Sequence, residues 1–315
     1  KGLSSLKLKI ALFISDTLLF ATPLLFTALG GMFTEKAGVT NIGLEGMMTI
    51  GAFAGATVGY FTKSALLGFI AGGIAAALVA LIHAIVCITF GADQVVSGIA
   101  INFIGPGVSL FICSLLFEGA KQTIPVADGE GKMIKIFDNL TGIQFIEKIL
   151  GQYITTYIAL GLVALISIYL YKTKFGLRLI AVGEHPKAAE TLNVNVYLYR
   201  YFAVVISGLL AGFGGATMSL ATVSNFSQSL ISGHGFIALV AVIFGKWKPY
   251  GVLGACLFFG AAQELAILLP GLNINIPESI LPMVPYISTL LVLIFFVGKS
   301  KGPSSAGVPY IKLED

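Results

Sequence analysis

The sequence predicts an all-α, polytopic membrane protein, and three observations support this prediction. Hydrophobic residues make up 57% of the 315 residues and charged residues only 11%, against about 25% charged residues in ordinary soluble domains. Apolar runs that are long enough to span a bilayer recur along the chain. No polar stretch of domain size separates these runs, so we expect a single transmembrane domain over residues 1–315.

The apolar runs predict the membrane segments one by one. A bilayer core of roughly 30 Å needs about 20 apolar residues in a helix. The full-length candidates are residues 10–32, 65–90, 95–117, 153–171, 201–220, 250–269 and 283–298. Two other runs do not fit this pattern. Residues 38–62 are punctuated by glycines, and residues 235–246 reach only about 18 Å as a helix, which predicts a half-helix.

Loop charges predict the side of the membrane on which each loop lies. Residues 172–200 are mainly basic, whereas residues 118–152 carry a balanced set of charges. By the positive-inside rule, 172–200 is cytoplasmic and 118–152 is an external loop. Lysines outside the first and last spans predict that both termini are cytoplasmic. With the N-terminus and 172–200 both cytoplasmic, the number of membrane crossings between them must be even. Residues 38–62 must therefore enter the membrane and return, or break into two short helices, which gives about ten membrane segments, some of them short or broken.

Each of two pseudo-related halves therefore contains one interrupted segment, at 38–62 and at 228–246. Non-helical backbone at membrane depth is tolerated only where protein or a water-filled cavity satisfies its polar groups. Paired interruptions of this kind indicate a substrate pathway. The alternative is that the glycines merely allow helices to pack closely.

Four polar residues lie where such a pathway is expected. Asn41 and Glu45 are four residues apart, so in a helix they share one face. Gln94 and Asn102, two turns apart, place a second polar stripe in the 95–117 span. These side chains either contact a polar substrate or brace the interrupted segment, and the sequence leaves both roles open for Glu45.

The loop at 176–195 contains a short helix with clear boundaries. Pro186 suits the first helical position, and Asn193 suits the left-handed residue that follows a helix. Between them, Pro186–Leu192 forms about two turns, and we expect the small residues Ala188 and Ala189 to be exposed. A short helix of this kind suits docking into a groove on a partner. The alternative is an ordinary solvated loop.

Several classes of function are disfavoured by the motifs. The chain has no phosphate-binding GxxxxGK[ST] loop and no HExxH pair. Its three cysteines lie inside apolar runs, which predicts buried thiols. No basic patch interleaved with aromatic residues suggests nucleic acid. The sequence contains no nucleophile or metal motif that would support an intramembrane enzyme. A stand-alone secondary transporter would leave the loop at 176–195 without a role.

Four stretches carry a resemblance to a known family. They are GVTNIGLEGMMTIGAF from residue 38, ADQVVSGIAIN from residue 92, FGLRLIAVGEHPKAAETLNVN from residue 175 and FGKWKPYGVLGACLFFGAAQEL from residue 244. They resemble permease subunits of bacterial ABC importers, in the branch that serves branched-chain amino acids, pentoses and nucleosides. The NIGLEGMM segment is most similar to nucleoside permeases, and the similarity extends over roughly 20–298.

The resemblance implies a transmembrane subunit that imports a nucleoside by alternating access, with a pentose or a branched-chain amino acid as the alternative substrate. It implies that the ATPase-coupling residues lie in a cytoplasmic loop and include Glu184, Pro186, Ala188, Ala189, Glu190 and Asn193. Asn193 stands where importers usually have glycine, and asparagine tolerates the left-handed conformation.

The same resemblance implies the partners and the location. A cytoplasmic ATPase would bind ATP and Mg²⁺, so no cofactor and no catalytic residue are expected in this chain. A second permease subunit, expected to be a different chain, would complete the pathway, and an external substrate-binding lipoprotein would deliver the nucleoside near 221–234. The chain itself would lie among the lipids of the bacterial plasma membrane.

Overall fold

The computed structural model describes residues 2–126, 131–137, 144–272, 283–296 and 301–312. Parts of the predicted external loop at 118–152 and the last two residues of the predicted 283–298 span lie outside these ranges. The described elements are helical: α1 (Gly2–Lys36), α2 (Leu44–Thr62), α3 (Ala65–Ala84), α4 (Gln94–Leu116), α5 (Gln144–Leu150), α6 (Ile154–Lys172), α7 (Lys174–Glu184), α8 (Pro186–Thr191), α9 (Val196–Thr217), α10 (His234–Phe244), α11 (Pro249–Leu268) and α12 (Val284–Phe296).

The long apolar helices match the predicted spans closely. Two of them continue into a wider π-helical turn, α3 through Ile85–Thr89 and α9 through Met218–Thr222. Within the described residues, six helices are long and apolar enough to cross a membrane, beginning at Lys7, Ala65, Gln94, Ile154, Val196 and Pro249. This is fewer than the ten or so segments predicted, partly because α10 and α12 have only 11 and 13 residues. The half-helix predicted at 235–246 is present as α10.

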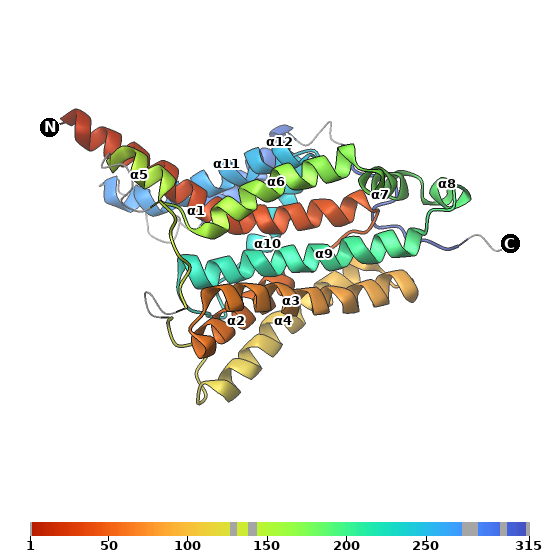
Figure 1. Cartoon of the computed structure of the whole chain (residues 1–315), viewed down its shortest axis with the longest axis horizontal. Coiled ribbons are helices and arrows are strands. Elements are labelled where there is room, and N and C mark those ends of the chain that lie inside the picture. The colour runs from red at the N-terminus through yellow and green to blue at the C-terminus, as the bar shows by residue number, and fades with distance from the viewer. Residues whose placement is uncertain (1, 127–130, 138–143, 273–282, 297–300, 313–315) are drawn as a thin grey trace.

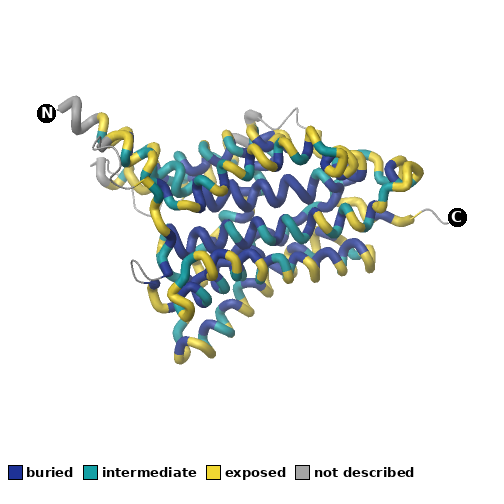
Figure 2. The backbone as a smooth tube through the Cα atoms, viewed as in Figure 1, coloured by how far each residue is buried: buried dark blue, intermediate teal, exposed yellow. Residues whose placement is uncertain are grey.

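Helix α9 lies at the centre of the bundle, between α1 on one side and the pair α2–α3 on the other (Figure 1). In its most apolar stretch 78% of the residues are buried, against 22% in α4, which leans away from the bundle. Figure 2 shows the same pattern, with buried backbone concentrated in the central helices. The three cysteines are buried and unpaired, as the sequence predicts.

The prediction for residues 38–62 was wrong about where the helix is interrupted. The glycines do not break α2, which is continuous from Leu44 to Thr62. They allow close packing instead: a Cβ atom on Gly51 would lie 2.4 Å from the Cα of Gly212 in α9. The interruption comes earlier, where the turn at 37–43 separates α1 from α2.

An unbroken α2 also changes the arrangement of the two termini. Five helices now run along the bundle before α7, namely α1, α2, α3, α4 and α6. Because this number is odd, α1 starts at the end of the bundle opposite to α8, whereas the C-terminal segment lies at the same end as α8 (Figure 1). This arrangement departs from the prediction that both termini lie on the cytoplasmic side, since the returning segment on which that prediction depended is absent.

Candidate functional site

The turn at 37–43 is held by the side chain of Asn41, which is completely buried. Its Oδ1 accepts a hydrogen bond from the backbone N–H of Gly43 at 3.1 Å, so the side chain closes a local turn. Its Nδ2 donates to Oγ of Ser207 in α9 at 3.1 Å and lies 3.4 Å from Sδ of Met47. Asn41 therefore attaches the turn to the central helix.

Two residues of α4 hold the same turn from the other side. Oε1 of Gln94 accepts from the backbone N–H of Thr40 at 2.7 Å. Asn102 accepts from the N–H of Gly46 at 2.9 Å and donates to the carbonyl of Ile42 at 2.9 Å. These bonds satisfy backbone groups that an interrupted helix leaves without partners.

The carboxylate of Glu45 connects this turn to the second interrupted segment. Oε1 accepts from the backbone N–H of Gly233 at 2.5 Å, and Oε2 accepts from that of Gly235 at 2.7 Å. These amides begin α10, where the N-terminal end of a helix attracts negative charge. Gly233 has φ of +91°, a conformation that favours glycine. Glu45 thus caps a half-helix that starts inside the bundle.

All four residues predicted to line a pathway therefore gather around the two interruptions. Their hydrogen bonds lead to protein groups, which favours the bracing role for Glu45 that the sequence left open. One polar atom in the group remains without a partner, Nε2 of the buried Gln94 side chain. His83 of α3 lies nearby and is fully buried, with Nδ1 2.8 Å from Oγ of Ser97.

A pocket of about 530 Å³ lies directly beside the start of α10. Its polar lining consists of Ser229, Ser232, His234, Gln263 and Tyr286. These residues were not predicted individually from the sequence, although the polar run from Asn225 to His234 between two apolar spans was a signal for them. The Tyr286 hydroxyl donates to the carbonyl of Ser232 at 2.5 Å, which fixes the aromatic ring at the pocket wall.

The hydrogen bonds of His234 determine what Gln263 can offer to a ligand. Nδ1 of His234 contacts the carbonyl of Ile231, and a carbonyl can only accept, so Nδ1 donates. On the other side of the ring, Nε2 of His234 lies 3.1 Å from the side-chain oxygen Oε1 of Gln263. The amide oxygen of Gln263 therefore faces the ring, and its NH₂ group is the part that can donate to a ligand.

The second candidate site is the short helix α8 with the loops around it. Pro186 occupies its first turn, and Asn193 follows it with φ of +60°, so the predicted helix and its left-handed stop are confirmed. The prediction that both alanines are exposed was wrong. Ala188 is exposed, but Ala189 is buried against Val182, Val196 and Tyr310.

The two predicted acidic residues at this site face different surroundings. Oε2 of Glu184 accepts from the hydroxyl of Ser304 at 2.9 Å, so its carboxylate is engaged within the chain. Glu190 is half-buried beside Tyr310. Burial, together with the neighbouring Glu190 carboxylate, raises the pKa of the Tyr310 phenol, so this ring stays neutral at physiological pH.

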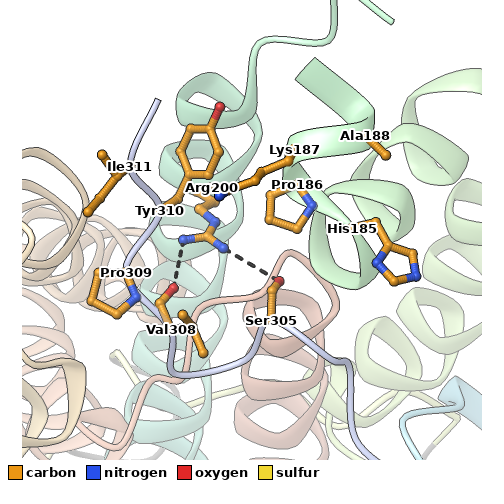
Figure 3. A pocket seen from close by; sticks show the side chains of 10 residues that line it. All are labelled: His185, Pro186, Lys187, Ala188, Arg200, Ser305, Val308, Pro309, Tyr310 and Ile311. Atoms are coloured by element: carbon orange, nitrogen blue, oxygen red, sulfur yellow. Dashed lines mark hydrogen bonds between the residues drawn. The ribbon is translucent and has the colours of Figure 1, made fainter. Parts of the chain in front are cut away.

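A groove of about 580 Å³ separates α8 from the C-terminal segment, defined here as residues 301–312 (Figure 3). Pro186 and Lys187 form one wall, and Val308 to Ile311 form the other. Arg200, from the first turns of α9, lies at the base between them (Figure 3). In the sequence Arg200 is only one of the basic residues of 172–200, and its burial was not predicted.

The two candidate sites touch each other. Gly183 at the end of α7 packs against the end of α1 so closely that a Cβ atom there would lie 2.1 Å from the carbonyl oxygen of Lys36. Lys36 immediately precedes the turn at 37–43. The end of α7 is therefore in contact with the turn that Asn41, Gln94 and Asn102 hold.

Comparison with known proteins gives consistent results. Residues 13–297 match the family described as "Branched-chain amino acid transport system / permease component". The chain is 46% identical over 314 residues to the guanosine ABC transporter permease protein NupQ of Bacillus subtilis, covering 96% of this chain and 97% of that protein. It is 39% identical over 314 residues to the nucleoside ABC transporter permease protein NupC of Lactococcus lactis, covering 95% and 96%. These matches confirm the resemblance that the sequence motifs indicate.

A solved structure shares the fold. It is described as an inward-facing ABC transporter of the metal-chelate type, and it superposes with a TM-score of 0.53 over 92% of this chain and 97% of that one. At 15% identity this likeness concerns the arrangement of helices alone. With the apolar helices described above, these findings show an integral membrane protein.

Proposed function

We propose that this chain, which belongs to the family of permease components of branched-chain amino acid transport systems, is the membrane subunit of an ATP-driven nucleoside importer. The observation that carries this proposal is the identity of 46% over 314 residues with a guanosine permease. A second nucleoside permease at 39% identity supports the same substrate class. The family description keeps a branched-chain amino acid as the second candidate substrate.

In this proposal the substrate pathway runs beside the two interrupted segments, at the turn 37–43 and at the start of α10. Asn41, Glu45, Gln94 and Asn102 would shape its wall by holding the turn at 37–43 and the start of α10. The pocket formed with Gln263 and Tyr286 would offer a transient site to the nucleoside. An aromatic ring suits a base, and an amide NH₂ group suits a carbonyl or ring-nitrogen acceptor, whereas a purely apolar wall would suit neither.

The coupling part of the proposal places the ATPase at α8. Residues 172–200 would be the cytoplasmic coupling loop, with Pro186 and Ala188 at the contact and Asn193 ending the helix. Glu184, Ala189 and Glu190 would support this helix from within the chain, since their contacts are intramolecular. ATP and Mg²⁺ would bind to the ATPase, and this chain would contribute no cofactor site. Within the described residues, no group of three side chains could hold a metal ion.

The remaining partners follow from the same assignment. The end of the bundle opposite to α8, which carries α5 and the described part of 118–152, would face outward and receive a substrate-binding lipoprotein (Figure 1). A second permease subunit, of a different sequence, would pack beside this one in the bacterial plasma membrane. ATP-driven closure of the ATPases would move α8 and change which end of the pathway is open. Substrate would shift that equilibrium only through different affinity for the two states.

Reconstitution tests this function. The chain is placed in proteoliposomes with its second permease, the ATPase and the binding protein, and uptake of labelled guanosine is compared with that of labelled leucine. We expect guanosine uptake that requires ATP, the ATPase and the binding protein. Uptake by this chain alone would identify a secondary transporter or channel instead, and leucine uptake would move the substrate to the amino acid class.

A further inference from the structure

The C-terminal segment returns to the end of the bundle where α7, α8 and α9 meet. The backbone N–H of Ser305 donates to the carbonyl of Gly183 at 3.0 Å. The hydroxyl of Ser305 donates to the same carbonyl at 2.6 Å. Together with the bond from Ser304 to Glu184, these contacts fasten the segment to the last turn of α7.

Arg200 fastens the same segment to the central helix α9. Its side chain is only 2% exposed. Nη1 donates to the carbonyl of Val308 at 3.1 Å, and Nη2 lies 3.5 Å from Oγ of Ser305. The guanidinium carbon lies 5.6 Å from the ring centre of Tyr310, a cation–π contact. These partners all belong to the C-terminal segment, as Figure 3 shows for the two hydrogen bonds.

Tyr310 fastens the segment to α8. It completes a small apolar cluster with one residue from each neighbouring helix, Val182 of α7, Ala189 of α8 and Val196 of α9. Helix α8 has only six residues and Ala189 is its one buried residue, so it has little else to hold it in place. A helix this short has negligible stability of its own and depends on such contacts.

We infer that the C-terminal segment helps to couple ATP hydrolysis to transport. Through the contacts of Arg200 and Tyr310, it ties α8 rigidly to the central helix α9. This inference rests on the proposed function, in which α8 receives movement from the ATPase. Without the tie, α8 would shift against α7 and α9, and the movement would not reach the pathway. Arg200 and Tyr310 are thus positioning residues, and neither needs to touch the substrate.

Two substitutions test the tie in the complete complex. Arg200→Met removes the charge at similar volume, and Tyr310→Ala removes the ring but leaves both Arg200 hydrogen bonds in place. We expect both complexes to hydrolyse ATP while the number of substrate molecules taken up per ATP falls by about tenfold, within the range usual for linked sites. Tyr310→Phe keeps the ring in the apolar cluster and over the Arg200 guanidinium, so it should restore the ratio.

A second readout does not depend on transport. A spin label on Ala188→Cys reports the mobility of α8, and the native cysteines are buried. The label should become more mobile with Tyr310→Ala, but not with Leu198→Ala, a control on the exposed side of α9. An unchanged uptake per ATP in both tie variants, or an unchanged label mobility, would overturn the inference. If the unsubstituted complex imports no nucleoside, the proposed function fails, and the label still decides whether the tie exists.

Discussion

The carboxylate of Glu45 and the backbone amide of Gly233 lie 2.5 Å apart although 188 residues separate them in the sequence. This contact joins the turn before α2 to the first turn of the half-helix α10, so the two interrupted segments of the chain form one structural unit. A charge that is costly at this depth is compensated by two backbone N–H donors and by the end of a helix.

Glu45→Gln should therefore destabilise the protein and leave substrate preference unchanged. A carboxamide offers one acceptor in place of two, so one of the amides of Gly233 and Gly235 loses its partner. A hydrogen bond to a charged group contributes about 1.5–3 kcal/mol, and we expect the free energy of unfolding to fall by about this amount. The thermal stability of the purified complex measures it, with the exposed Glu118→Gln as control. A stable complex with altered substrate preference would show instead that Glu45 contacts the substrate.

The contrast between Asn193 and Glu45 shows what could be predicted from sequence. The boundaries of α8 depend on local chemistry, the fixed φ of Pro186 and the left-handed tolerance of Asn193, so they were predicted correctly. The partners of Glu45 come from a distant part of the chain. Periodicity and composition carry no information about such a contact.

Ala189 shows the same limit within one helix. Two adjacent alanines look alike in the sequence, and which of them faces inward depends on Tyr310, in a segment more than 100 residues away. In α2, likewise, glycines can break a helix or let it approach another. The position of Gly212 in α9 decides between these possibilities, and it is not visible from residues 38–62.

Gly51→Ala should weaken the packing of α2 against α9. The added methyl group would lie 2.4 Å from the Cα and 2.6 Å from the carbonyl oxygen of Gly212, and backbone atoms cannot move aside without shifting a helix. Overpacking of this kind costs about 1–3 kcal/mol. The matched control is Gly107→Ala in α4, where a Cβ atom would meet nothing within 4 Å. Thermal unfolding of both variants provides the comparison, and equal melting temperatures would contradict the close approach.

Ala188→Arg should uncouple transport from ATP hydrolysis without disturbing the fold. Ala188 is exposed on α8, so a large charged side chain would obstruct the proposed contact with the ATPase while the apolar cluster around Ala189 stays intact. Ala188→Ser is the control of similar size. Copurification of the ATPase and ATP-dependent uptake are the measurements. Normal association with the ATPase and normal uptake in the Arg variant would show that α8 is not part of the coupling contact. The neighbouring Ala189→Arg cannot serve this purpose, since it would disrupt packing within the chain.

Gln263→Leu should raise the KM for guanosine uptake while the affinity of the binding protein for guanosine stays the same. The substitution keeps the size of the side chain but removes the amide group, whose oxygen faces His234 and whose NH₂ group can donate to a ligand in the pocket beside α10. Loss of one hydrogen bond of about 0.5–1.5 kcal/mol corresponds to a change of about two- to tenfold in KM.

The control for this change is Gln228→Leu, an exposed glutamine that does not line the pocket. Uptake is measured over a range of guanosine concentrations with the binding protein in fixed excess, so that both variants receive substrate in the same way. A higher KM in the Gln263 variant alone places the nucleoside in this pocket during transport, because the two substitutions are chemically identical. Equal KM values in the two variants would move the pathway away from α10 and Tyr286, toward surfaces shared with the second permease.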